Sequence, residues 1–331
     1  MVRNFWFWMA LAIAVLAGAD ARAVPVDGFG AMGASETAGT DYTGSWVPYL
    51  ANQRGFNFGG AGQPWNVAVG GATSATLLTP QHQHETVRDL VANGSVDLAY
   101  LSIGANDFNA VAASIANGTL TGQPLINWAQ GVVNNINTAT DTVLAAHPLG
   151  MIVAGVPDIL LTPNGRAAFN TPDKQLRGTT AINLVNSLLK PQVLGRGLVY
   201  VDLAGALRDV NAAPFVVGGV TIDMINPSAD PTHFFQDGLH PAAVGNGFVA
   251  NLMLAAVNVG YGTAYSPLSD LEILTTAGLA SSYTGPTSAV NYAHYITVPE
   301  PSTLLLAAGG LFAMSLLLGH RVRRLASAVR T

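Results

Sequence analysis

The sequence predicts a three-layer α/β/α fold with a mainly parallel sheet of five strands. Three observations predict it: short, almost wholly apolar segments recur along the chain, segments of helical periodicity alternate with them, and turn residues separate the two kinds. Strands that are apolar on both faces are typical of a parallel sheet covered by helices on both sides and joined by right-handed crossovers. Half of the 331 residues are apolar, which is enough to bury one large core.

The expected elements follow one another in a regular order. Apolar runs of strand length occupy residues 24–29, 65–69, 97–103, 150–156 and 197–203. Helical periodicity occupies residues 44–54, 80–93, 125–147, 173–194 and 242–259, and it is clearest over 125–147, where Pro148 follows the last turn. The pattern weakens over 214–236, which we interpret as a loop with a short helix.

The N-terminal 23 residues have the features of a secretory signal peptide. Arg3 lies in a short charged head, an apolar run covers residues 5–18, and Ala21-Arg22-Ala23 is a small-x-small cleavage site. The alternative is an uncleaved N-terminal anchor, but the apolar run is shorter than the roughly 18 residues that a membrane span needs.

The C-terminal residues 298–331 predict sorting to the cell envelope. Pro299-Glu300-Pro301 is followed by an apolar stretch over 303–319 and then by three arginines, Arg321, Arg323 and Arg324. The stretch is long enough to span a membrane, and its arginines place the rest of the chain outside. Box, span and basic tail resemble the PEP-CTERM sorting signal, which implies recognition and removal by an exosortase-type membrane enzyme; the alternative is a plain C-terminal membrane anchor.

A single catalytic domain is expected between the two signals, over residues 24–262. A terminal helix around 268–279 and a flexible linker, rich in Ser, Thr, Gly and Tyr, follow over 263–297. Only 10% of the residues are charged and the net charge is −5, so no basic face is available for nucleic acid. The chain has no cysteine, which excludes disulfides and thiolate metal sites.

Candidate catalytic residues lie in loops that follow the expected strands. Ser35 follows the first strand, and Asp237 and His240 lie in the loop before the helix over 242–259. In parallel sheets such loops meet beyond the carboxyl ends of the strands. A serine hydroxyl needs an adjacent base, and a spacing of three residues lets Asp237 accept the Nδ1 proton of His240 and leave Nε2 free for Ser35.

Together with Asn66…Gly71 and Gly104-Ala105-Asn106-Asp107, these blocks resemble the SGNH (GDSL-like) hydrolase family over residues 26–261. The resemblance implies a flavodoxin-like fold with Ser35 as nucleophile and His240 as base. It also implies an oxyanion hole formed by the backbone N–H groups of Ser35 and Gly71 and the side-chain amide of Asn106, with no cofactor.

The first block departs from the family, because Ala34 stands where the family commonly has aspartate. That aspartate is expected to brace the nucleophile turn, so the departure predicts weakened activity rather than none. Glu36, the next candidate for a brace, is expected to be exposed.

The predicted function is an exported serine esterase that acts on acyl esters. Two substrate classes stay open: acylated polysaccharide, such as acetylated glycan, and lipid or small soluble esters. A function of another class, a surface or matrix binding protein that keeps the fold without turnover, is the alternative. Three further features have simpler interpretations: the pair His82 and His84 is a solvated helix start rather than a metal site, Asp107 caps a helix or bonds a neighbouring loop, and Trp46, Trp65 and Trp128 are core or pocket wall.

Overall fold

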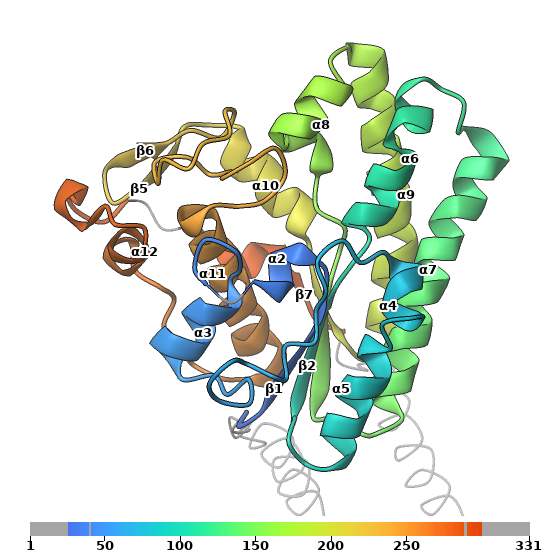
Figure 1. Cartoon of the computed structure of the whole chain (residues 1–331), viewed down its shortest axis with the longest axis horizontal. Helices are drawn as coiled ribbons and strands as arrows, with labels where there is room; N and C mark the ends of the chain where they lie inside the picture. Colours follow the sequence, from blue (N-terminus) through green and yellow to red (C-terminus); the bar gives the residue numbers. More distant parts are fainter. Residues whose placement is uncertain (1–25, 40, 288–289, 300–331) are drawn as a thin grey trace, which may run out of the picture. The chain divides into compact units, whose positions relative to one another are not determined.

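A five-stranded sheet with the order β1-β2-β3-β4-β7 forms the centre of the fold (Figure 1). The computed structural model describes residues 26–39, 41–287 and 290–299, so the predicted signal peptide and the apolar stretch over 303–319 lie outside the described residues. Strands β1 to β4 are parallel, and β7 is antiparallel to β4. The strands are β1 (Phe29–Gly33), β2 (Leu98–Ser102), β3 (Gly150–Ala154), β4 (Val199–Val201) and β7 (Ile296–Thr297).

The helices confirm the predicted alternation with the strands. They are α2 (Ser35–Ala38), α3 (Val47–Arg54), α4 (Ser74–Leu78), α5 (Gln83–Ala92), α6 (Ala105–Ala116), α7 (Gly122–Leu144), α8 (Pro163–Ala168), α9 (Pro172–Gly195), α10 (Leu203–Asn211), α11 (Ala243–Tyr261) and α12 (Asp270–Thr276). Short 3-10 turns are η1 (Ile159–Leu161), η2 (Ala280–Ser282) and η3 (Tyr292–Tyr295). A small antiparallel hairpin, β5 (Phe215–Val217) and β6 (Val220–Ile222), lies apart from the sheet.

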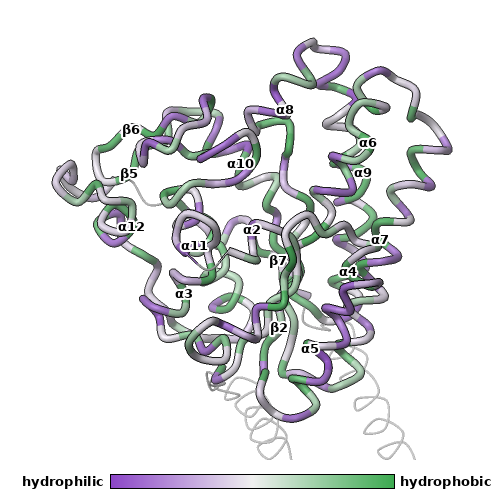
Figure 2. The backbone as a smooth tube through the Cα atoms, viewed as in Figure 1, coloured by the Kyte–Doolittle hydropathy of each residue, from purple (hydrophilic) through white to green (hydrophobic). Residues whose placement is uncertain are grey.

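Alternate residues of strands β1 to β4 enter two separate cores, as expected for a sheet buried on both faces. One core contains Leu98 and Tyr100 of β2 and is covered by α3, α10 and α11. The other contains Ala99 and Leu101 and is covered by α5, α7 and α9. Figure 1 shows α5, α7 and α9 on one side of the sheet and α3 and α11 on the other. Figure 2 shows hydrophobic residues concentrated along the central strands. The predicted three-layer α/β/α architecture is confirmed.

Two details of the first two predicted strands differ in the structure. The first strand is predicted over residues 24–29, but β1 begins at Phe29 and stays extended through Gly33. Before it, Gly28 packs directly against the backbone of Ser95. The segment 65–69 makes only one isolated parallel bridge, between Ala31 and Asn66. It still runs beside β1, since the backbone N–H of Val67 donates to Ala31 O at 2.9 Å. When the segment 65–69 is counted as the second strand in sequence and β2, β3 and β4 as the third, fourth and fifth, the order across the sheet is 2-1-3-4-5, as in flavodoxin-like folds.

The prediction of a flexible linker over the last part of 263–297 is wrong. Tyr295 and Ile296 are buried, and Ile296 and Thr297 of β7 pair with Val201 and Tyr200 of β4. The Tyr295 hydroxyl also donates to Asp209 Oδ2 at 2.9 Å. An apolar Tyr-X-X-Tyr-Ile run supplies the burial that a linker lacks, and the compact unit therefore extends to Val298 rather than ending at 262.

The helix α11 forms the centre of one helix layer. It is long and apolar enough to cross a membrane by composition, but most of its residues are buried inside the domain. Its contacts with α3, α12, β4 and η3 identify it as a core helix. The Tyr49 hydroxyl donates to Ala243 O at 2.8 Å and ties α3 to the start of α11.

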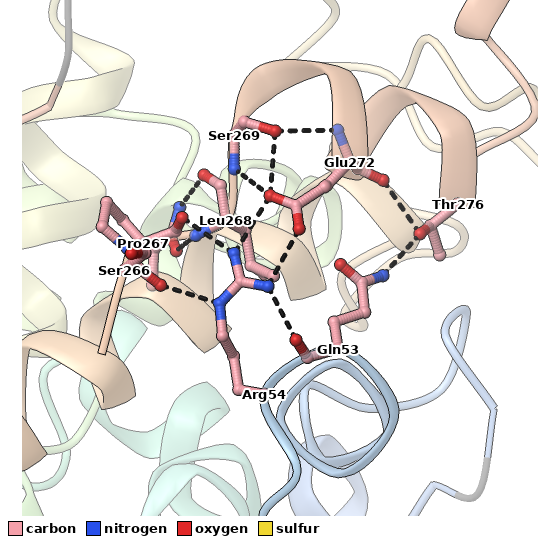
Figure 3. Close-up of polar contacts among 9 residues, drawn as sticks. Gln53, Arg54, Ser266, Pro267, Leu268, Ser269, Glu272 and Thr276 are labelled. Atoms are coloured by element: carbon pink, nitrogen blue, oxygen red, sulfur yellow. Dashed lines mark hydrogen bonds and ion pairs between the residues drawn. The ribbon is translucent and has the colours of Figure 1, made fainter.

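Arg54 fastens the C-terminal segment to α3 (Figure 3). Its guanidinium donates to both carboxylate oxygens of Glu272, at 2.9 and 3.0 Å, and to the backbone oxygens of Ser266 and Pro267. Glu272 in turn accepts from the backbone N–H of Ser269 at 2.7 Å in a capping box that begins α12. One arginine therefore holds both the cap of α12 and the segment that leads to it.

Candidate active site

Ser35 lies at the carboxyl edge of the sheet, directly after β1. Ala34 is the N-cap of α2, and Ser35 is the first residue of the helix. The backbone N–H groups of a first helical turn have no acceptor within the helix, so the N–H of Ser35 is available beside its own hydroxyl. The strand and the helix together present a hydroxyl and a backbone donor at one point.

His240 reaches Ser35 from a loop more than two hundred residues away in sequence. Its Nε2 lies 2.8 Å from Ser35 Oγ, and its Nδ1 lies 2.8 Å from Asp237 Oδ2. Because a carboxylate only accepts, Nδ1 carries the proton, and Nε2 of the neutral ring accepts from the serine hydroxyl. The structure thus brings together the three side chains that the sequence predicts to act together.

The Asp237 carboxylate also shapes the loop that carries His240. Its Oδ1 accepts the backbone N–H groups of Leu239 and His240, each at 2.7 Å. Burial raises the pKa of this carboxyl, but the hydrogen bonds from the backbone and ring of His240 and from Leu239 outweigh burial and hold the pKa below its usual value. The carboxylate therefore stays ionised and keeps the ring in one orientation.

The rest of this loop is fixed by buried aromatic residues and by a close backbone contact. Phe234 and Phe235 are buried, and Phe234 O accepts from the backbone N–H of Ala242 at 2.7 Å. Gly238 O accepts from the backbone N–H of Asn164 in α8, and a Cβ at Gly238 would collide with the Asn164 side chain. The loop is anchored on both sides of the Asp237–His240 turn, so the imidazole is held without bound substrate.

Two more predicted donors lie in the neighbouring strand-end loops. Gly71 follows the edge segment beside β1, and within the described residues its backbone N–H has no hydrogen-bond acceptor. Asn106 is in the first turn of α6, and one N–H of its amide donates to Ala72 O at 2.9 Å. This bond leaves the second amide N–H of Asn106 available and fixes the direction of the side chain relative to the Gly71 loop.

Asp107 bonds the neighbouring loop, one of the two roles predicted for it. Its two carboxylate oxygens accept from the backbone N–H and the hydroxyl of Ser74, each at 2.7 Å. Asn135 of α7 donates to the same hydroxyl at 3.0 Å. These bonds join the start of α6 to the start of α4, and so hold Asn106 and the Gly71 loop next to each other.

Two side chains brace the nucleophile turn beside Ala34: Gln83, which the sequence analysis did not single out, and Asn66, which it named only as the start of a block. The Gln83 amide donates to Gly33 O at 3.1 Å, and its Oε1 accepts from Gly33 N at 2.9 Å. The side chain of Asn66 donates to Thr37 O at 2.6 Å. Ala34 itself is buried in the core. The signal for Gln83 is its position four residues before Val87, which places a polar side chain on the apolar face of α5.

A cavity of about 80 Å³ opens beside Ser35 and His240. Its wall is predominantly apolar and includes Ile159, Leu203, Leu207, Phe234, Phe248 and Val249. Glu36, expected to be exposed, is instead partly buried and lines this cavity together with Tyr100 and Asn106. The site therefore combines a serine, a base and an apolar recess.

The remaining candidates lie away from this site. His82 Nδ1 is 3.3 Å from Glu85 at the exposed start of α5, and His84 is buried. Among the residues that the structure describes, no group of three or more His, Cys, Asp or Glu side chains is arranged to hold a metal ion. Trp46 is fully buried in the core covered by α3, α10 and α11, and Trp65 and Trp128 are partly buried against the core on the other face of the sheet.

Comparison with known proteins places these residues inside a family match. The family model described as GDSL-like lipase/acylhydrolase matches residues 29–253, and that described as the PEP-CTERM protein-sorting motif matches residues 297–324. No curated relative matches the sequence.

Several solved structures resemble the chain. An extracellular lipase from Streptomyces rimosus is 17% identical with a TM-score of 0.47, and the match covers 71% of this chain and 99% of the lipase. A phospholipase A1 from Streptomyces albidoflavus is 19% identical with a TM-score of 0.45, covering 71% of this chain and all of the other. A variant of an acetyl xylan esterase from Geobacillus stearothermophilus is 15% identical with a TM-score of 0.42, and the match covers 72% of this chain and 97% of the esterase.

Proposed function

Because the chain belongs to the GDSL-like lipase/acylhydrolase family and carries a PEP-CTERM sorting motif, it is an exported serine ester hydrolase, and we propose that Ser35 is its nucleophile. In this proposal His240 is the general base and acid, and Asp237 orients it. The single observation that supports the assignment most is the chain of two 2.8 Å contacts from Ser35 Oγ through the His240 ring to Asp237.

The proposed reaction passes through an acyl-serine. Ser35 Oγ attacks the ester carbonyl while His240 Nε2 takes the hydroxyl proton, and the carbonyl electrons move onto oxygen. The tetrahedral intermediate then collapses, the bond to the alcohol breaks, and His240 returns the proton to the leaving oxygen. Water repeats the sequence on the acyl-serine, releases the carboxylic acid and restores the serine.

The developing oxyanion is proposed to bind three donors. These are the backbone N–H groups of Ser35 and Gly71 and the free amide N–H of Asn106. Donors of this kind stabilise a transition state most when they are held in place before the reaction, and each is typically worth about 3 kcal/mol. The contacts of Asn106 with Ala72 and of Asp107 with Ser74 provide that preorganisation.

The cavity favours short acyl or alkyl groups in the substrate. Since an apolar cavity of about 150 Å³ holds benzene, one of about 80 Å³ has room for roughly three or four non-hydrogen atoms. We propose that esters with a short group on one side of the carbonyl are the substrates, either small soluble esters or short acyl groups on polysaccharide. The chain of a long-chain lipid ester exceeds this volume.

The sorting motif suggests where the enzyme acts. We propose that an exosortase-type membrane enzyme processes the C-terminal tail, and that the hydrolase works in the cell envelope or outside the cell, with its C-terminus anchored before processing. The signal peptide expected over residues 1–23 agrees with this route.

A fluorophosphonate probe and a series of p-nitrophenyl esters test the catalytic proposal together. We expect one modified residue, Ser35, with no labelling in Ser35→Ala and with turnover of acetate and butyrate esters reduced by about 10⁴-fold or more. His240→Ala should lose a similar share of turnover. Labelling that persists in Ser35→Ala, or turnover that survives in both variants, would contradict the assignment; a folded enzyme with an unreactive Ser35 would favour the binding-protein alternative.

A further inference from the structure

Two polar side chains that the proposed reaction does not use line the cavity beside Ser35. Glu36 follows Ser35 in α2, and Tyr100 lies in the middle of β2. The remaining wall, apart from Ser35, His240, Asn106 and Thr162, is made of apolar side chains. Burying a carboxyl and a phenol hydroxyl in an apolar recess costs free energy unless a hydrogen-bond partner pairs with each of them.

Tyr100 supplies a hydrogen-bond donor without a partner. The side chain is 0% exposed, and within the described residues its hydroxyl makes no hydrogen bond. Its ring packs edge-on against Trp46, with ring centroids 4.9 Å apart and an interplanar angle of 74°, so the hydroxyl is held in one direction. A buried hydroxyl left unpaired costs roughly 1–3 kcal/mol, which a bound group that pairs with it recovers.

Glu36 supplies the second polar group. Burial raises the pKa of its carboxyl above the usual value, although hydrogen bonds from its own backbone and from Ser102 and the charge of His240 oppose the shift. A carboxyl that is protonated more readily offers both a donor and an acceptor. Within the described residues, Tyr100, Glu36 and His240 are the titratable side chains that line the cavity.

We propose that Tyr100 and Glu36 are specificity-determining residues that together recognise a hydroxyl group on a short chain of the ester substrate. A hydroxyl accepts a hydrogen bond from the Tyr100 phenol and donates one to the Glu36 carboxyl, while its carbon chain contacts the apolar wall. An alkyl chain of the same length leaves the Tyr100 hydroxyl unpaired and gives the Glu36 carboxyl no partner in the cavity. Sites with buried polar groups discriminate strongly against an analogue that lacks the matching polar group.

This inference rests on the proposed function and names its substrate class. The cavity of about 80 Å³ limits the chain to roughly three or four non-hydrogen atoms. The substrate is therefore an ester of a short hydroxy acid, or an ester of a short alcohol that bears a second hydroxyl.

Matched ester pairs test it on each side of the carbonyl. The first pair is p-nitrophenyl butyrate and p-nitrophenyl 3-hydroxybutyrate, and the second is propyl acetate and 2-hydroxypropyl acetate. We expect the wild-type kcat/KM for the hydroxylated member of at least one pair to be about tenfold higher or more. Tyr100→Phe and Glu36→Leu should bring that ratio close to one, and Glu36→Gln, which keeps a donor and an acceptor, should retain most of it.

Tyr200→Phe is the matched control, because Tyr200 is a buried strand tyrosine on the opposite face of the sheet. It should leave the ratio unchanged. All variants should still react with the fluorophosphonate at Ser35, which separates a change in recognition from loss of the fold or of the nucleophile.

Ratios near one in the wild type for both pairs would overturn the inference while Ser35 is still labelled. Ratios that do not change in Tyr100→Phe and Glu36→Leu would overturn it equally. A wild type that is not labelled at Ser35 would overturn the proposed function itself, and this inference with it.

Discussion

The carboxamide of Gln83 makes two reciprocal hydrogen bonds with the backbone of Gly33, two residues before Ser35. Oε1 accepts from Gly33 N at 2.9 Å, and Nε2 donates to Gly33 O at 3.1 Å. Gln83 is 1% exposed and comes from the first turn of α5. The end of β1 is thus held by a side chain fifty positions away, in a turn where Ala34 itself supplies no polar side chain.

Replacing Gln83 by leucine is expected to misplace the nucleophile rather than remove it. The Gly33 N–H and C=O would lose their partners, and small displacements at a reacting centre cost up to about 100-fold in rate. We expect kcat and the rate of fluorophosphonate labelling to fall about 10- to 100-fold, with KM changed less than threefold. Gln81→Ala, which removes a neighbour of Gln83 but none of its bonds to Gly33, is the control. Equal labelling rates in Gln83→Leu and wild type would rule out this role.

Asn106→Ala should lower kcat about 10²- to 10³-fold with little effect on KM, because an oxyanion donor acts mainly in the transition state. The measurement is steady-state kinetics on p-nitrophenyl acetate. Asn109→Ala, an exposed change one turn along the same helix, should leave both constants near wild type. A loss below threefold in Asn106→Ala would mean that the second amide N–H does not bind the oxyanion.

Arg54→Met should destabilise the domain by about 2 kcal/mol, because it removes hydrogen bonds to a carboxylate and to two backbone oxygens. For a domain of this size that corresponds to a fall of about 4–8 °C in Tm at pH 7. Arg88→Met, which removes an exposed ion pair with Asp89, should change Tm by about 1 °C or less. A Tm for Arg54→Met within 1 °C of wild type would show that these Arg54 hydrogen bonds do not stabilise the domain.

The same ion pair predicts how stability depends on pH. The Arg54 guanidinium, with the Ser269 cap, lowers the pKa of Glu272 to about 2 from a usual value of 4.5. A carboxyl with a depressed folded-state pKa stabilises the fold above its unfolded pKa and loses that contribution as the pH falls through the folded one. The difference in Tm between wild type and Arg54→Met should therefore be full at pH 6 and shrink towards pH 2. A difference that stays constant over this range would exclude the Glu272 charge as its source.

Two truncations separate the fold from the tail. Deleting residues 300–331 removes none of the contacts described here and should leave Tm within about 2 °C of that of the full chain. Deleting residues 290–331 removes β7 and the buried Tyr295 and Ile296, and exposes the edge of β4. We expect the second truncation to lower Tm by at least about 5 °C and to aggregate, as an uncovered strand edge does. Equal Tm values would show that the strand adds no stability.

Much of the fold could be predicted because the long helices and the apolar strands leave clear periodic patterns of apolar residues in the sequence. The helices over 125–147, 173–194 and 242–259 appear as α7, α9 and α11 with boundaries shifted by a few residues. The strand-end positions of Ser35 and Asn106 followed from the same alternation. That reasoning brought residues far apart in sequence to one edge of the sheet, and the distance between Ser35 and His240 agrees with it.

What could not be predicted depends on contacts between distant segments. The hairpin of β5 and β6 turns at Gly218-Gly219, a hairpin signal within 214–236 that the interpretation as a loop overlooked. β7 has only two residues, so no periodicity marks it, and its pairing depends on the exposed edge that β4 offers. The burial of Glu36 follows from the packing of α2 against β1 and the cavity wall, which no local pattern of charge reports.

The direction of β7 carries the last described residues away from the edge of the sheet where Ser35 lies. The strand starts level with Val201, near the Ser35 edge, and runs back towards the level of Tyr200 and beyond. The chain also enters β1 from that far side, where the backbone of Gly28 is bonded to Asp97. A reporter or an immobilising tag joined directly before Val26 or after Val298 would therefore be attached at the end of the sheet opposite the Ser35 hydroxyl and the His240 imidazole.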